Sequence, residues 1–162
     1  MSIEKVRAFF REKGREGDIL EFDVSSATVE LAAEAVGVIP ARIAKTLSFS
    51  VNGGCVLVVA AGDVKIDNTK FKAQFHCKAK MLTADEVIHF TGHAVGGVCP
   101  FGVTNTDVEA YLDLSLRRFD TVYPAAGSAS SAIKLTCAEL EAYSACAGWV
   151  DVCKGWQEAP PV

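Results

Sequence analysis

The sequence has no long hydrophobic run and no targeting segment. No apolar stretch approaches the roughly 18 residues that a membrane-spanning helix requires. The opening residues, MSIEK, lead into a charged amphipathic segment instead of the apolar core of a signal peptide. We therefore expect a cytoplasmic protein that does not bind membranes.

Familiar metal-binding and nucleotide-binding motifs are also missing. The six cysteines form no CxxC pair, which excludes zinc-ribbon and thioredoxin-like sites. The chain has no HExxH motif, no Walker A loop and no EF-hand spacing. We expect neither a metal ion nor another cofactor, and we interpret the cysteines as free thiols.

A broad basic surface is absent too, because the formal net charge is −4. This balance argues against a protein that binds DNA through an extended positive face. Locally the charge differs, since residues 65–80 contain five lysines against the single acid Asp67. Such a cluster is typical of a solvated helix face, and it is also suited to contact a phosphate backbone. Both interpretations remain open from the sequence. The lysines are Lys65, Lys70, Lys72, Lys78 and Lys80.

The patterns that are present predict one α+β domain over residues 1–162. Asn52-Gly53-Gly54 lies between two apolar runs and predicts a β-hairpin, whose second strand is apolar throughout and therefore central. We expect regular structure to end near residues 149–152, with Pro160-Pro161 in a tail. The predicted helices are 2–14, 28–36, 69–75, 136–143 and one beginning at 83; the predicted strands are 18–22, 43–51, 56–61, 110–112, 120–123 and 132–135.

Residues 92–102, GHAVGGVCPFG, hold four glycines and a proline and predict a shaped loop. Such a loop can direct consecutive N–H groups at an anion or a developing oxyanion, or it can be a tight connection between buried strands. Cys99 and His93 are the one thiol–imidazole pair close in sequence, so a thiol enzyme is an alternative hypothesis. A small residue that packs the loop is the simpler interpretation of Cys99.

Lys45 lies near the start of an otherwise apolar strand, after Ile43 and Ala44. Its ammonium group either reaches solvent along the rim of the sheet or points into a cleft. In a cleft it would provide a fixed positive charge for a phosphate or a carbonyl group, and burial would lower its pKa.

Three segments in register resemble the YbaK/prolyl-tRNA synthetase-associated domain family. They are AKTL at residues 44–47, the loop 92–102, and Ala126-Gly127 followed by IKL at 133–135 and Glu139-Leu140. The resemblance covers nearly the whole chain. It implies a single α+β domain with a mixed, curved sheet and surrounding helices. It also implies hydrolysis of the ester between a wrong amino acid and the terminal adenosine of a tRNA.

The resemblance implies the following site. Lys45 is the principal functional residue, and the Gly-x-x-x-Pro element at 96–100 supplies backbone groups around the ester, with Gly96 and Gly97 as catalytic donors. An activated ester needs a held water and a stabilised oxyanion more than a protein nucleophile, which agrees with the missing triad. The expected substrate-binding residues are Ser26, Thr28, Thr46, His93, Val98, Cys99, Pro100, Ala126, Gly127 and Ser128.

Two positions depart from the deacylases of cysteinyl-tRNA in that family. Thr28 stands where they carry a pocket phenylalanine, and about Ala132 stands where they carry an acid. We therefore expect a trans-acting deacylase for a small amino acid such as alanine, serine or threonine, on the tRNA for proline or a related one. The expected partners are the tRNA acceptor end and an aminoacyl-tRNA synthetase. The alternative is a non-catalytic module of the same fold that binds tRNA or a synthetase.

Overall fold

A curled, mixed six-stranded sheet forms the centre of the protein in the computed structural model, which describes residues 2–156. The strand order is β8-β6-β2-β3-β5-β9, and the bounds are β2 (Ile43–Val51), β3 (Gly54–Ala61), β5 (Val108–Asp113), β6 (Thr121–Pro124), β8 (Leu135–Thr136) and β9 (Gly148–Val150). Two short antiparallel pairs flank it: β1 (Ile19–Glu21) with β7 (Ser131–Ile133), and β4 (Lys65–Ile66) with β10 (Cys153–Lys154). The predicted single α+β domain is confirmed.

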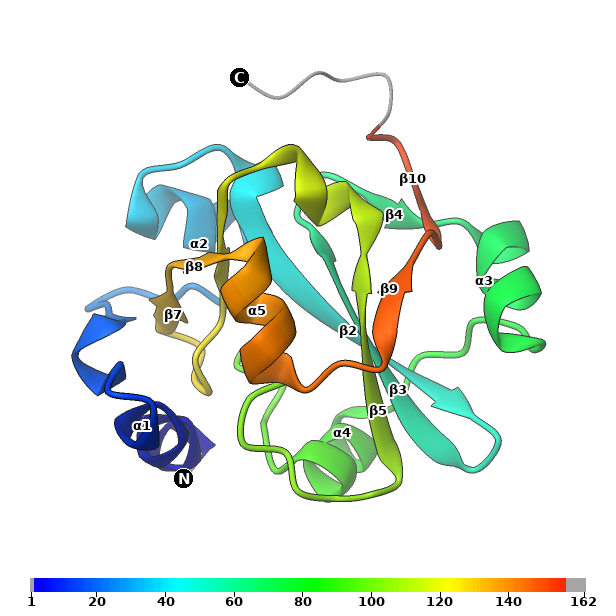
Figure 1. Ribbon diagram of the computed structural model, residues 1–162, viewed down its shortest axis with the longest axis horizontal. Coiled ribbons are helices and arrows are strands. Elements are labelled where there is room, and N and C mark those ends of the chain that lie inside the picture. Colours follow the sequence, from blue (N-terminus) through cyan, green and yellow to red (C-terminus); the bar gives the residue numbers. More distant parts are fainter. Residues whose placement is uncertain (1, 157–162) are drawn as a thin grey trace.

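The β2–β3 hairpin is the central element, as the sequence predicts. Asn52 and Gly53 both have positive φ angles, 52° and 81°, the conformation that a two-residue turn of the favoured hairpin type requires. Seven of the eight β3 residues are buried, which confirms a strand covered on both faces. Figure 1 shows the hairpin crossing the middle of the molecule.

Within residues 2–156, five α-helices surround this sheet, and α3 lies across the hairpin from α1 and α2 in the view of Figure 1. Thr28 caps α2 by accepting a hydrogen bond from the Leu31 N–H. Thr83 and Thr136 begin α4 and α5 with complete capping boxes. None of the described helices is long and apolar enough to cross a membrane. The helices are α1 (Ser2–Glu12), α2 (Val29–Val36), α3 (Asn68–Phe75), α4 (Ala84–Thr91) and α5 (Cys137–Ser144).

Aromatic residues fill the core on both faces of the sheet. Phe49 of β2 contacts Phe71 of α3, with ring centroids 4.7 Å apart. Phe10 of α1 packs at 4.9 Å against Phe101, the aromatic residue of the glycine-rich loop. The first helix therefore holds one end of the loop 92–102 in place.

Two predictions about the later elements are wrong. The strand expected at 132–135 is divided at Lys134, because β7 pairs with β1 whereas Leu135 and Thr136 pair with β6 in the main sheet. Regular structure also continues beyond residue 152, since β10 forms a pair with β4. Between β5 and β6 the chain forms the 3-10 helix η3 (Leu114–Arg118). Pro160-Pro161 lies outside the described residues.

Candidate active site

A cleft opens where β6 separates from β2. The two strands pair in parallel at Ile43 and Ala44 only. Farther along the same edge of β2, the segment 80–82 pairs with this strand in place of β6. The Ser50 N–H donates to the Lys80 carbonyl, and the Leu82 N–H donates to the Ser48 carbonyl. Within residues 2–156, positions 45–47 therefore have no paired strand on this edge. Residues 45–47 form the floor of a cavity.

The cavity has a volume of about 450 Å³ and is lined by segments that are far apart in the sequence. Its size lies in the range of small-molecule sites. Lys45 is the one lysine, arginine or acidic residue among the lining residues that the structure describes. The lining consists of Ser26, Ala27, Thr28, Val29, Ala32, Ile43, Ala44, Lys45, Thr46, Leu47, Ser48, Met81, Leu82, Val87, Val95, Gly96, Val98, Tyr123, Ala125, Ser131 and Ala132.

The Lys45 ammonium group is held by backbone carbonyls just after β3. Its Nζ donates to the carbonyl oxygens of Gly62, at 3.4 Å, and Val64. An ammonium group has three N–H donors, so these two acceptors leave one for a ligand. Burial lowers the pKa of Lys45 below its ordinary value, although Cys153, Asp63 and Glu30 oppose this shift. Since no carboxylate forms an ion pair with Lys45 among the described residues, its charge is available to an anionic group.

Two buried hydroxyl groups of residues that line the cavity lack hydrogen-bond partners among the described residues. The Oγ of Ser26 and the Oγ1 of Thr46 are shielded from solvent, and neither forms a hydrogen bond with a described residue. Both residues line the cavity. A buried polar atom without a partner costs about 1–3 kcal/mol, a cost that a hydrogen-bonding ligand would remove after a small rotation of the side chain. The pair is therefore a candidate contact for polar groups of a substrate.

The glycine-rich loop contributes Val95, Gly96 and Val98 to the cavity wall, where Gly96 packs against Ala27. Gly97 has a different place. Its N–H donates to the Ala94 carbonyl at 3.0 Å, and a Cβ there would lie 2.7 Å from the Ser128 backbone. The Gly97 amide therefore forms a hydrogen bond within the loop and is not the oxyanion donor that the sequence led us to expect. The missing side chain permits close packing on Ser128.

His93 and Cys99 are core residues beneath the loop. Both have an exposed fraction of 0%. The His93 Nε2 lies 3.0 Å from the Phe101 carbonyl and 3.7 Å from the Cys99 Sγ. Burial raises the pKa of the Cys99 thiol to about 12, so the nucleophilic thiolate is scarce at neutral pH. This position disfavours both the thiol-enzyme alternative and direct contact of either side chain with a substrate.

Replacing Cys99 with alanine is therefore expected to leave catalysis within about twofold of the wild-type rate, because the thiol does not face the cavity. Iodoacetamide should label Cys99 only after unfolding. The measurement is ester hydrolysis together with peptide mapping of the alkylated native protein. A folded Cys99→Ala protein without activity would restore the thiol mechanism.

The other expected contacts divide between the cavity and the core. Ser26, Thr28 and Thr46 line the cavity, as do the two positions where the sequence departs from the cysteinyl-tRNA deacylases, Thr28 and Ala132. Pro100 instead lines a separate cavity beside β5. The expected contacts at 126–128 lie behind the wall: Ala126 is fully buried, and the Ser128 Oγ donates to the Ser131 Oγ at 2.8 Å.

Sequence reasoning missed Ser131 and the segment 81–82, which line the cavity. Of residues 125–128, which the resemblance implies beside the pocket, Ala125 lines the cavity and 126–128 do not. The small-residue pattern located this segment but not the face that each residue presents. Met81 and Leu82 reach the cavity through their pairing with β2, a contact between segments that no local pattern indicates.

Comparison with known proteins identifies the family. The family model described as the aminoacyl-tRNA editing domain matches residues 24–143. The uncharacterized protein YwhH of Bacillus subtilis (strain 168) is 54% identical over 158 residues, which cover 97% of this chain and 100% of that protein. The proline–tRNA ligase of Thermotoga sp. (strain RQ2) is 34% identical over 91 residues, 56% of this chain but 15% of the ligase.

The fold is shared with solved structures as well. A candidate trans-editing enzyme for prolyl tRNA synthetase superposes with a TM-score of 0.84 at 30% identity, covering 95% of this chain and 98% of that one. The hypothetical protein APE2540 superposes with a TM-score of 0.76 at 26% identity, over 89% of this chain and 99% of that one. The matched family model spans α2, the β2–β3 hairpin, the loop 92–102 and most of α5, and so includes every residue that lines the cleft. The chain belongs to the aminoacyl-tRNA editing domain family.

Proposed function

We propose that this protein is an aminoacyl-tRNA deacylase that hydrolyses the ester of a mischarged tRNA in the cleft beside Lys45. The observation that carries the proposal is the convergence of Lys45, Gly96 and Val98 on one cavity in a chain of the editing family. These residues come from segments about fifty positions apart, yet they line a common space. The arrangement combines a positive charge with a glycine-rich backbone wall.

The reaction needs positioning more than a protein nucleophile. Water forms a bond to the ester carbonyl carbon, and the carbonyl oxygen becomes an oxyanion. Collapse of this intermediate breaks the bond to the ribose oxygen, which takes up a proton, and releases the amino acid. Backbone N–H groups of the wall around Gly96 and Val98 stabilise the oxyanion, an effect worth about 3–4 kcal/mol for one well-placed donor. We assign the proton transfer to a hydroxyl group of the substrate, which accepts a proton from the attacking water as it passes its own proton to the departing ribose oxygen.

Lys45 orients the substrate in this scheme. Its remaining N–H donor binds the phosphate or ribose of the terminal adenosine, which holds the ester against the glycine-rich wall. The amino-acid side chain lies among small residues, including Thr28, Ala32 and Ala132. We propose a small amino acid as the substrate, carried by the tRNA for proline or a related tRNA.

A deacylation panel tests the proposal. Purified protein is incubated with tRNA for proline charged with alanine, serine, threonine, cysteine or proline, and release of the labelled amino acid is followed. We expect fast release of at least one small amino acid and retention of proline. Binding of tRNA without release across the panel would favour the alternative, a non-catalytic binding module.

A further inference from the structure

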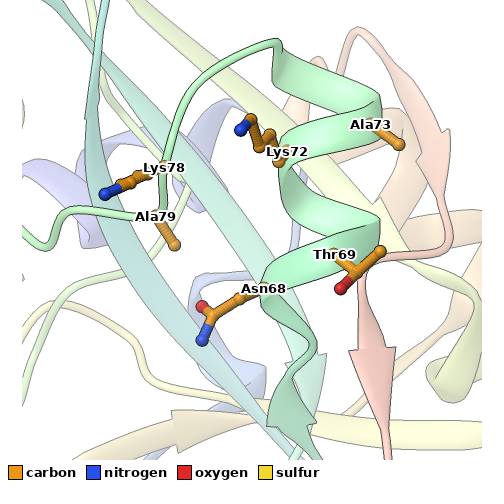
Figure 2. A pocket seen from close by; sticks show the side chains of 6 residues that line it. All are labelled: Asn68, Thr69, Lys72, Ala73, Lys78 and Ala79. Atoms are coloured by element: carbon orange, nitrogen blue, oxygen red, sulfur yellow. The ribbon is translucent and has the colours of Figure 1, made fainter.

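A second cavity lies beside the cleft, between α3 and the segment that follows it. Its volume is about 640 Å³, and its polar lining comes from Lys72, Lys78, Asn68 and Thr69. Figure 2 shows the side chains of Lys72, on α3, and Lys78, on the adjacent segment, at the edge of this opening. Ala73 and Ala79 complete the lining.

The positive charge of this cavity is not neutralised by the protein. Neither Lys72 nor Lys78 forms an ion pair with any residue in the part of the chain that the structure describes, and both are exposed. The nearby Lys70 does have an acidic partner, since its Nζ lies 3.0 Å from Asp151. The Asp67 carboxylate accepts hydrogen bonds from the Thr69 and Lys70 N–H groups, so it faces the N-terminal end of α3. An anionic ligand therefore meets two free ammonium groups.

This cavity is joined to the catalytic cleft by five consecutive residues. Lys78 and Ala79 line the lysine cavity, whereas Met81 and Leu82 line the cleft. The connecting residues run along β2, with Phe49 and Met81 bridged in antiparallel fashion. At about 3.3 Å per extended residue, Lys78 and Met81 are separated by about 10 Å along the chain. A ligand that leaves the cleft along this edge thus reaches the lysines within a few nucleotides.

We propose that the lysine cavity binds phosphate groups of the single-stranded tRNA end that precedes the terminal adenosine. The inference rests on the proposed deacylase function and adds the place where the rest of the substrate binds. Lys72 and Lys78 contact the phosphates as cations, and the Asn68 amide and the Thr69 hydroxyl supply neutral hydrogen bonds. Contacts of this kind position the strand without reading its sequence.

The test compares two substrates and three variants. Lys72→Ala/Lys78→Ala removes the two charges, Lys72→Arg/Lys78→Arg keeps them, and Lys134→Ala removes an exposed lysine elsewhere. Each protein is assayed on intact mischarged tRNA and on the same amino acid esterified to adenosine alone. Thermal unfolding checks that each variant is folded.

We expect the alanine double variant to lose about tenfold or more in kcat/KM on the tRNA and nothing on the adenosine ester. The slope of log kcat/KM against log salt should become shallower by about 1.4, because two single-strand phosphate contacts contribute about 0.7 each. The arginine and Lys134→Ala variants should resemble the wild type. Equal loss on both substrates, or no loss on either, would overturn the proposal. If the wild-type protein hydrolyses neither substrate, the deacylase function itself fails.

Discussion

Replacement of Lys45 by methionine is expected to lower kcat/KM for ester hydrolysis by about 100-fold or more, the size of loss seen when one directed donor is removed from an active site. The Lys45 Nζ is held by the Gly62 and Val64 carbonyls, and Lys45 is the one charged residue that lines the cleft among those described. Methionine keeps the apolar stem and removes the charge. The measurement is single-turnover release of labelled amino acid from mischarged tRNA.

A measurement of stability distinguishes this loss of activity from a loss of folded protein. Burial lowers the pKa of Lys45, so the charged form is less favourable in the folded protein than in the unfolded chain. The unfolded chain therefore retains the proton to higher pH, and wild-type stability should rise relative to Lys45→Met as the pH approaches the ordinary value of 10.5. At neutral pH the methionine variant should be at least as stable as the wild type in urea unfolding. A stable variant with full activity would contradict the role assigned to Lys45.

Gly97→Ala is expected to combine a loss of stability with a loss of activity. The added Cβ would lie 2.7 Å from the Cα and N atoms of Ser128 and 2.8 Å from the Gly127 carbonyl carbon, all of them backbone atoms that cannot rotate away. Overpacking of this kind costs about 1–3 kcal/mol. Relief of the clash moves the loop away from residues 127–128 and displaces Gly96 and Val98 from the cavity wall. We expect at least a tenfold fall in kcat, since small displacements of positioning groups have large effects.

Gly148→Ala is the matched control for this prediction. A Cβ at Gly148 meets nothing within 4 Å, and the φ angle there is not positive. Its unfolding free energy should stay within about 0.5 kcal/mol of the wild type, as for other unstrained substitutions. The comparison uses urea unfolding and ester hydrolysis of both variants side by side. If Gly97→Ala behaves like Gly148→Ala, close packing of the loop on Ser128 is not required.

The elements that local chemistry specifies were predictable from the sequence. Asn52-Gly53 places the hairpin turn because both residues tolerate positive φ. Thr83 and Thr136 mark helix starts because their hydroxyl groups satisfy N–H groups in the first turn. The short strands β7, β8 and β10 were not resolved from sequence, since each is two or three residues long and depends on a partner far away in the chain.

The candidate site, like the fold, was predictable from the sequence only in part. Sequence patterns located the segments around Lys45 and Gly96, which the structure brings to one cavity. They did not distinguish residues that face the cavity from residues that hold its wall, and so His93 was grouped with the contacts although its side chain is fully buried. Which side of an irregular loop faces a ligand depends on packing with distant elements, here α1 through Phe10 and Phe101.

The hydrogen bonds that join residues 80–82 to β2 have a geometric consequence. They attach the floor of one cavity and the edge of the other to a single stiff strand, so the spacing between the two sites cannot adapt to an occupant. A molecule that fills both must bring a matching length of its own. A nucleotide strand is long enough to occupy both sites, whereas an amino-acid ester that carries no strand is not. Length therefore distinguishes the two kinds of molecule before the ester is hydrolysed.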